Sequence, residues 1–344
     1  MSNRKQPVEA GQPVAPRAVD PRFIVGGVAP TAPAQGPTIV TPATSSRWRD
    51  TWRLLMGNRK ASVGMAILAF FILLALFGPV IFPQDPHAIT LDRLQPPSPT
   101  HWFGTTSFGE DVFVQTVVGA RFSVFMGLGI GVVTTIISVM VGLASGYFLG
   151  WIDEVLSLVS NVFLVLPTLP LAILLAAFLP YKGSLTIGFV LTVTGWSWGA
   201  RVLRSQTLSL RTWDCVEAAR AAGESTWRII FYEILPNETA IVAAQFFGTV
   251  IYAILAETAL EYLGLGDITS ATWGNMLFSA SNSAALLQEA WWWFLPPGLC
   301  IAILGAALTF INFGIDEIAN PRLRNEAGST RFFFKKLRKA RGSM

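Results

Sequence analysis

Long apolar stretches recur along the chain and alternate with shorter segments that are rich in charge, proline and glycine. A helix needs roughly 20 apolar residues to cross the hydrocarbon core of a bilayer, and it must satisfy its own backbone groups within the span. Stretches of about that length occupy residues 62–82, 123–149, 155–179, 184–208, 239–263 and 291–315. The pattern predicts an all-α, polytopic membrane protein with six transmembrane helices.

Two connections between these stretches are long, at residues 83–120 and 264–290. The proline and glycine of the first connection exclude a continuous helix until Glu110, after which DVFVQTVVGARF predicts a short helix that leads into the membrane. The second connection is rich in glycine and serine and predicts a re-entrant or capping loop over a cavity. Within the third stretch, Pro167 and Pro170 predict helix kinks.

Composition and charge agree with a lipid environment. Hydrophobic residues make up 52% of the chain and charged residues 13%, against about 25% charged residues in an ordinary soluble domain. Lysine and arginine gather at both ends of the chain and in residues 209–238, and the opposite side keeps only Arg93, Arg121 and Lys182. Cytoplasmic loops retain positive charge, so both termini and the 209–238 loop of this multi-pass cell-membrane protein are expected in the cytoplasm.

The segments that flank the membrane domain divide further. Residues 1–46 predict a disordered cytoplasmic tail, residues 47–60 an interfacial amphipathic helix, residues 61–322 the six-helix domain, and residues 323–344 a basic cytoplasmic tail. Because the basic residues flank apolar spans, the expected partner for them is membrane lipid, and no nucleic acid is expected. No metal site is expected, since His87 and His101 are far apart in sequence and lack neighbouring ligands. Cys215 and Cys300 predict no disulfide.

The 209–238 loop carries an unusual number of charges for so apolar a chain. WDCVEAARAAG predicts a helix that ends at Gly223, the residue type that best adopts a left-handed cap. Ser225 is then placed to cap a second helix, TWRIIFYEIL, which Pro236 is expected to end. On this second helix, helical spacing predicts one common face, formed by Trp227, Ile230, Phe231 and Ile234. The predicted shape is a helix, a bend and a second helix, parallel to the membrane and projecting into the cytoplasm.

This loop resembles the EAA loop of the membrane subunits of binding-protein-dependent ABC importers. That loop has the form EAA, three residues, glycine, about nine residues, then I-x-L-P. The chain matches it at Glu217, Ala218, Ala219, Gly223, Leu235 and Pro236. It departs at Glu233, which stands where the general pattern has isoleucine, with Ile234 one place later.

Other segments resemble the C-type permease subunit of dipeptide and oligopeptide importers, over roughly residues 50 to 322. The matching segments are PPSPTHWFGT, GEDVFVQTVVGAR, GYFLGWIDEVLSLVSN, RIIFYEILPN, ILAETALEYLGLG and TWGNML. Thr106 and Glu110 replace the aspartate and arginine of the family's FGTD and GRD signatures, and Glu261 replaces a small polar residue. The end of the last stretch, INFGIDEIANPRLR, resembles a shortened version of the family's N-x-x-GDGLRDxLDPR segment.

The resemblance implies a type I ABC importer permease fold and a set of partners. A homologous second permease subunit would form a heterodimer with this chain, two ATP-binding subunits or domains would bind ATP and Mg, and an extracytoplasmic substrate-binding protein would deliver cargo to residues 83–120 and 264–290. It also implies that the EAA loop, including Trp227, is a coupling helix held by an ATPase subunit. The chain has no GxxxxGK[ST] phosphate loop, so no cofactor and no enzymatic activity are expected in this chain itself.

Three polar residues in the last two stretches are candidates for the translocation path or a subunit contact: Glu257, Glu261 and Asn312. Glu257 and Glu261 are one helical turn apart and share a face, and ionisable residues at such depth usually face a cavity or a partner helix. The alternatives are a hydrated pair near the outer interface and, for Asn312, a polar packing contact.

Three alternatives of function stay open. The same importer role is compatible with a non-peptide cargo, such as a nickel complex or an oligosaccharide, in place of di- or oligopeptides. An ion-driven secondary transporter ordinarily shows an internal repeat, which is not evident here, and leaves the EAA loop unexplained. An intramembrane enzyme would need a nucleophile with a base, but no histidine lies within a predicted span and there is no HExxH.

Overall fold

The computed structural model describes residues 58–181 and 183–319, which fold as helices joined by loops, with no strand among them. The predicted tails at 1–46 and 323–344, and residues 47–57 of the predicted interfacial helix, lie outside the described residues. Residues 59 and 60 already belong to the first long helix. The helices are α2 (Arg59–Ile81), α3 (Val112–Phe148), α4 (Gly150–Val165), α5 (Thr168–Phe178), α6 (Ser184–Leu210), α7 (Asp214–Ala221), α8 (Thr226–Arg228), α9 (Leu235–Tyr262), α10 (Trp273–Asn282) and α11 (Trp291–Ala319), with a π-helix at Ile229–Ile234 between α8 and α9.

The all-α membrane fold is confirmed, and the structure supports up to five of the six predicted spans by length and composition. Four are single helices: α2, α3, α11 and the continuous helix from Thr226 to Tyr262. A fifth is the pair α4 and α5, bent by 91° at a short break. Helix α6 covers the fourth predicted stretch with 27 residues, but its serine, threonine and arginine residues make it less apolar. The fourth predicted span, at α6, therefore stays a prediction.

The break in the third span confirms a kink at Pro167. This residue is the N-cap of α5, with φ −66° and ψ 116°, and its extended backbone separates α5 from α4. Pro170 lies in the first turn of α5, where a missing backbone N–H costs no intrahelical hydrogen bond. The 91° turn is therefore set at Pro167, while Pro170 fits the start of α5 without a kink of its own.

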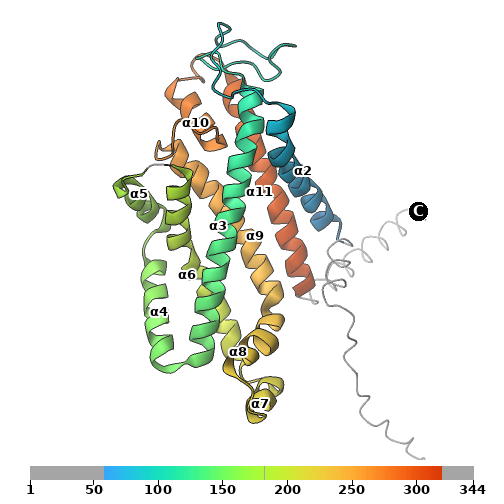
Figure 1. The fold of residues 1–344 in the computed structure, drawn as a ribbon, viewed down its shortest axis with the longest axis vertical. Helices are drawn as coiled ribbons and strands as arrows, with labels where there is room; N and C mark the ends of the chain where they lie inside the picture. The colour runs from blue at the N-terminus through green and yellow to red at the C-terminus, as the bar shows by residue number, and fades with distance from the viewer. Residues whose placement is uncertain (1–57, 182, 320–344) are drawn as a thin grey trace, which may run out of the picture. The chain divides into compact units, whose positions relative to one another are not determined.

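Helix α3 is the central element, and it packs along both α6 and α9, while α11 packs on α2 and α9 (Figure 1). Glycines make the α3–α6 approach close. A Cβ at Gly142 would lie 2.8 Å from the carbonyl oxygen of Ala200, and one at Gly146 would lie 2.6 Å from the Cβ of Thr207. Small residues at helix crossings let backbones approach in this way. The main core joins α2, α3, α9, α10 and α11 around the buried Trp273 and Trp293.

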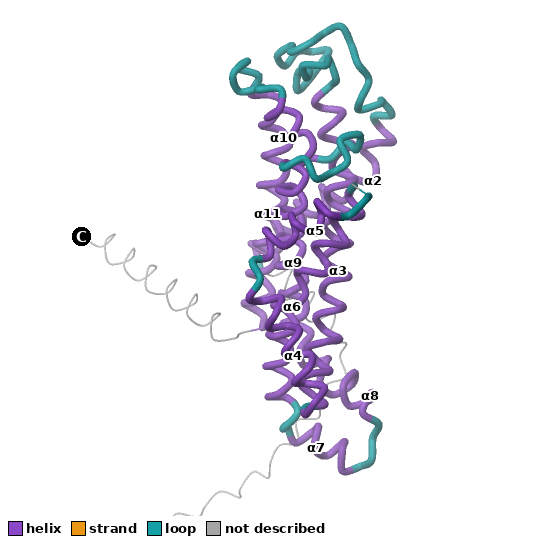
Figure 2. The backbone as a smooth tube through the Cα atoms, turned by 90° about the vertical axis from the view of Figure 1, so that its left-hand side faces the viewer, coloured by secondary structure: helices purple, strands orange, loops and turns teal. Residues whose placement is uncertain are grey.

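The two ends of the helical bundle differ. Helices α7 and α8 lie at one end, and the long connection that follows α2 lies at the other, near α10 (Figure 1 and Figure 2).

The predicted short helix after Glu110 is the beginning of the 37-residue α3, which starts at its N-cap Asp111. The Asp111 Oδ1 accepts hydrogen bonds from the backbone N–H groups of Phe113 (2.8 Å) and Val114 (3.1 Å). The second connection is not only a loop, because residues 273–282 form α10.

Tertiary contacts explain why a helix forms there. The Trp273 side chain is fully buried, and its Nε1 donates a hydrogen bond to the Thr116 carbonyl oxygen at 3.0 Å. Its backbone N–H donates to the Ser123 hydroxyl at 3.2 Å. Composition alone predicted a capping loop over a cavity, but these contacts with α3 stabilise a packed helix in its place.

Candidate functional site

The bend of the 209–238 loop forms at Gly223, as the sequence predicts. Gly223 has φ +77°, in the left-handed region. The backbone N–H of Gly223 donates to the Arg220 carbonyl oxygen, and that of Glu224 donates to the Ala219 carbonyl oxygen, both at 3.1 Å. Apart from Gly223 itself and its two chain neighbours, no heavy atom lies within 4 Å of a Cβ built at this position. Glycine is therefore required by the backbone conformation and not by lack of space.

The second helix does not end at Pro236, so that prediction was wrong. From Thr226 the helix continues without a break to Tyr262, and Pro236 lies in the first turn of α9. A π-helical segment, Ile229–Ile234, precedes it. The Asn237 side chain donates a 2.6 Å hydrogen bond to the Glu233 carbonyl oxygen, one turn earlier in the same helix. Ser225 stands at the predicted N-cap position, but its side chain makes no capping hydrogen bond.

The predicted common face of this helix divides in two. Ile230 and Ile234 are buried, whereas Trp227 and Phe231 are exposed and stack on each other with ring centroids 5.7 Å apart. The π-segment causes this, because its wider i→i+5 turn rotates successive residues differently from an α-helix. One face therefore anchors the loop, and the other is presented outward.

The inner face of the loop forms its own small core. Six buried residues make up this cluster, here called the loop base: Leu143, Leu210, Val216, Ile229, Ile230 and Ile234. They come from α3, α6, α7 and the π-segment, and the Arg220 guanidinium lies 5.7 Å from the centre of the Tyr147 ring on α3. The loop base thus fastens α7 and the π-segment to the ends of two long helices.

The outer face of the loop carries most of the EAA residues. Glu217, Ala218, Gly223 and Trp227 are exposed, and Ala219, Leu235 and Pro236 are half-buried. A shallow concavity beside them is lined by Trp227, Arg228, Phe231 and Tyr232. Exposed aromatic residues with an arginine are the composition found at the centres of protein interfaces. The loop is therefore a projecting element with an apolar base and an open aromatic surface.

Glu238, the last residue of the charged 209–238 loop, is one of the most buried acidic residues in the described part of the chain. Its side chain is 1% exposed. Its Oε1 accepts a 2.8 Å hydrogen bond from the Thr207 hydroxyl on α6, and its Oε2 has no partner among the described residues. A glutamate two residues after Pro236, at the start of a long apolar helix, is the sequence signal that could have found it.

Glu257 and Glu261 are also buried, at 2% and 1% exposure, which disagrees with the alternative of a hydrated pair at the interface. Glu261 accepts hydrogen bonds from the hydroxyls of Thr272 (2.6 Å) and Ser184 (3.4 Å). It thereby links α9 with the start of α6 and the N-cap of α10. The Glu257 Oε1 has no partner within the described part of the chain.

Asn312 lies apart from this pair. On α11 it faces Gly248 of α9, since a Cβ at Gly248 would lie 4.0 Å from the Asn312 Nδ2. Gly248 precedes Glu257 by about 14 Å along the helix axis. The Asn312 Oδ1 is buried without a partner among the residues described. The structure therefore brings Glu257 and Glu261 together and leaves Asn312 as a separate polar position between helices.

The two departures from the family signatures contact each other. The Thr106 hydroxyl donates to the Glu110 carboxylate at 3.1 Å, and the second Glu110 oxygen lies 3.3 Å from His87 Nδ1. Both substitutions thus belong to one polar cluster beside the start of α3.

Comparison with known proteins places the chain in a family. Residues 138–325 match the family described as the binding-protein-dependent transport system inner membrane component, and residues 46–97 match the N-terminal TM domain of oligopeptide transport permease C. The chain therefore belongs to the binding-protein-dependent transport permeases, and it is a multi-pass membrane protein.

Individual relatives cover most of the chain. The oligopeptide transport system permease protein OppC of Bacillus subtilis is 35% identical over 288 residues, which are 83% of this chain and 93% of that relative. The dipeptide transport system permease protein DppC of the same organism is 36% identical over 281 residues, 80% of this chain and 86% of the relative. OppC of Mycobacterium tuberculosis is 33% identical over 279 residues, 79% of this chain and 94% of the relative.

Proposed function

We propose that this chain is the membrane-spanning permease subunit of an ATP-driven importer for di- or oligopeptides. The observation that carries the proposal is the projecting 214–238 segment, whose apolar base is fixed to the ends of α3 and α6 and whose outer face exposes Glu217, Ala218 and Trp227. In a transport permease, such a surface has an evident use as the docking site of an energy-supplying subunit. The similarity to oligopeptide and dipeptide permeases supports the cargo.

The partners follow from this role. Two ATP-binding subunits or domains, which bind ATP and Mg, contact the EAA loop in the cytoplasm, where both termini also lie. A homologous second permease completes the path as a heterodimer, since a single six-span subunit has too little wall to enclose a peptide-sized passage. An extracytoplasmic binding protein docks on residues 83–120 and 264–290. Glu257, Glu261 and Asn312 serve the translocation path or contacts between subunits.

The mechanism is the transfer of a rigid-body movement. When the ATP-binding subunits close, the docked surface around Trp227 moves with them. The loop base transmits the movement to α3 and α6, and the unbroken backbone from Thr226 to Tyr262 transmits it to α9. A docked element that two global states place differently is the usual basis of such a switch.

The experiment reconstitutes the chain with its second permease, ATP-binding subunits and binding protein in proteoliposomes. ATP-dependent uptake of labelled di- and tripeptides is measured, with a nickel complex and an oligosaccharide as competing cargoes. Uptake of peptides that requires ATP hydrolysis is the expected result. Uptake of only a competing cargo would contradict the peptide assignment. Uptake by this chain alone, driven by a proton or sodium gradient, would contradict the importer role.

A further inference from the structure

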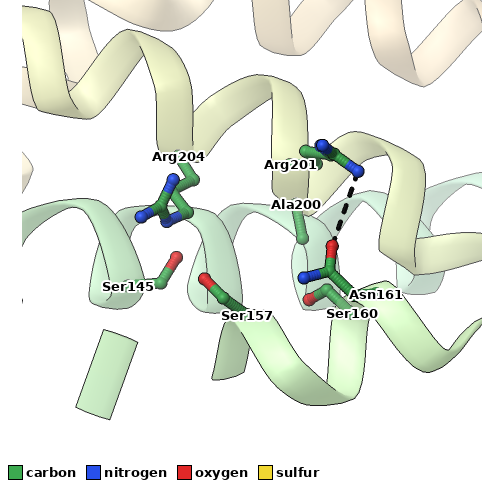
Figure 3. Close-up of a pocket in the computed structure, with 7 residues that line it drawn as sticks. All are labelled: Ser145, Ser157, Ser160, Asn161, Ala200, Arg201 and Arg204. Atoms are coloured by element: carbon green, nitrogen blue, oxygen red, sulfur yellow. Dashed lines mark hydrogen bonds between the residues drawn. The ribbon is translucent and has the colours of Figure 1, made fainter. Parts of the chain in front are cut away.

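A polar pocket of about 190 Å³ lies between α3, α4 and α6. Seven residues line it: Ser145, Ser157, Ser160, Asn161, Ala200, Arg201 and Arg204. Figure 3 shows their side chains between the helices, with Arg201 directed to Asn161 and Arg204 at the other end of the pocket. Two arginines in one pocket of a membrane domain require a source of negative charge nearby.

Arg204 has such a source and Arg201 does not. The Arg204 guanidinium forms a bidentate pair with Asp153, with distances of 2.6 Å (Nε to Oδ1) and 2.7 Å (Nη2 to Oδ2). Arg201 makes a single 3.4 Å hydrogen bond to the neutral Asn161 Oδ1, and it forms no ion pair with any residue in 58–181 or 183–319. The pocket therefore keeps one uncompensated positive charge.

On the prediction that α6 spans the membrane, the position of Arg201 well inside the helix argues against a simple lipid-facing side chain. Arg201 lies about 14 Å from the C-terminal end of α6 and about 26 Å from its start, at a rise of 1.5 Å per residue. Asn161 lies about 17 Å from the start of α4, so the Arg201 side chain is held at this depth and does not extend to the helix end. Yet Arg201 is exposed. A charged side chain at such depth faces a water-filled cavity or a partner, because exposure to lipid is costly.

The other polar groups of the pocket leave few free donors. The hydroxyls of Ser145 and Ser160 donate to backbone carbonyl oxygens of their own helices, and that of Ser157 donates to Asp153. The donors left over are those of the planar Arg201 guanidinium, the amide of Asn161 and the Nη1 of Arg204, whose charge Asp153 already offsets. A guanidinium fork matches the two oxygens of a carboxylate.

From this geometry we propose that Arg201, with Asn161 beside it, binds the C-terminal carboxylate of the peptide during its passage. This inference rests on the proposed peptide-import function and adds a binding site and a ligand group to it. The face of α6 that carries Arg201 lines the translocation path, and the ion pair of Arg204 with Asp153 holds α6 against α4 so that the site keeps its shape.

The test uses the complete reconstituted transporter and two probes, trialanine with a free carboxylate and trialanine with a C-terminal amide. Initial rates of ATP-dependent uptake are measured for the wild type, Arg201→Gln, Arg201→Lys and the control Arg121→Gln, which removes an exposed arginine of α3 outside the pocket. For each peptide, the rate of the variant is divided by the rate of the wild type. The preference of the binding protein for one peptide cancels in this ratio.

Arg201→Gln is expected to lower the ratio for the free peptide about tenfold more than the ratio for the amide, as loss of a charged hydrogen bond predicts. Arg201→Lys keeps the charge without the planar fork and gives an intermediate loss. Arg121→Gln affects both peptides equally.

Three results would overturn the inference. Equal losses on both peptides show that Arg201 does not bind the carboxylate. If the purified Arg201→Gln complex lacks the second permease, Arg201 forms an ion pair with an acidic residue of that subunit and does not bind the peptide. If the effect of Arg201→Gln on uptake vanishes in vesicles without anionic lipid, Arg201 binds a lipid headgroup. A wild-type complex that transports neither peptide contradicts the peptide-import function itself, which separates that failure from these.

Discussion

The Thr207 hydroxyl donates a 2.8 Å hydrogen bond to the buried Glu238 carboxylate, and so joins α6 to the start of α9. Thr207 is itself fully buried, and its Cβ is the atom that a side chain at Gly146 of α3 would strike. Three long helices thus meet at one point, next to the loop base. This point is where a movement of the coupling loop would enter the membrane domain.

Removal of the Thr207 hydroxyl should destabilise this junction. Thr207→Val keeps the shape of the side chain but leaves the Glu238 carboxylate without its partner, at a cost of about 1–3 kcal/mol in the free energy of unfolding. A lower melting temperature of the purified subunit in detergent is the expected readout. Thr212→Val is the matched control, because Thr212 is exposed and its hydroxyl bonds only to the nearby Ser209 carbonyl oxygen. Equal melting temperatures of both variants would show that the Thr207–Glu238 contact contributes nothing.

Substitution at Gly223 should uncouple peptide uptake from ATP hydrolysis, because it changes the backbone conformation of the loop and not a side-chain contact. Gly223→Ala places a Cβ in open space, yet the left-handed conformation costs about 1–2 kcal/mol for an L-residue. The loop should change its bend, and ATP-dependent uptake should fall. Gly223→Asn should lose less, since asparagine adopts this conformation more readily.

The control for Gly223 is Gly305→Ala in α11, which also meets no neighbour within 4 Å but has ordinary helical φ. This control should retain full uptake. If Gly223→Ala transports like Gly305→Ala, the bend at Gly223 is not required for coupling.

Trp227→Ala should weaken binding of the ATP-binding subunits without unfolding the chain. The Trp227 side chain is 67% exposed and stacks on Phe231, and truncation of a central interface tryptophan typically costs about 2 kcal/mol or more. Binding of the purified ATP-binding subunit to the permease in nanodiscs should weaken more than tenfold. Trp151→Ala, which removes another exposed tryptophan outside the loop, should bind as the wild type does, and a similar loss in both variants would argue against a docking role for Trp227.

Glu261 should stabilise the position of α10. Glu261→Ala removes the acceptor of the Thr272 and Ser184 hydroxyls and leaves a cavity next to Gly266 and Gly274, so hydrogen exchange in residues 264–282 should become faster. Glu261→Gln keeps an acceptor for Thr272 and should show a smaller change. Substitution of Glu289 by Gln serves as the exposed control. If hydrogen exchange in residues 264–282 is unchanged in Glu261→Ala, Glu261 does not hold α10 in place. Its role would then lie only in the translocation path.

The sequence predicted features that depend on local chemistry. Apolar stretch length located the long helices, the left-handed Gly223 followed from its place after a run of helix formers, and the break at Pro167 followed from proline geometry. The spacing of Glu257 and Glu261 placed them on one face, and the structure confirms that both point into protein.

Features that depend on tertiary contacts were missed or wrong. Pro236 does not end a helix, because Ile229, Ile230 and Ile234 pack within the loop base and stabilise a π-segment before it. The partners of Arg204 and Glu238 lie 51 and 31 residues away in the sequence, so no local pattern could identify them. Helix α10 forms because Trp273 finds a buried site against α3, which glycine and serine content does not indicate.

The most direct measurement of the central claim is site-directed cross-linking at Ala218 in the assembled transporter. Both native cysteines, Cys215 and Cys300, are first replaced by serine, and Ala218→Cys is then introduced on the exposed face of α7. If the loop docks on an ATP-binding subunit, a short thiol cross-linker joins the introduced cysteine to that subunit, ATP changes the yield of the cross-link, and the cross-link stops peptide uptake. Labelling of the same position by a membrane-impermeant maleimide added outside intact cells, with no cross-link to an ATP-binding subunit, would show that the loop is not a cytoplasmic docking site.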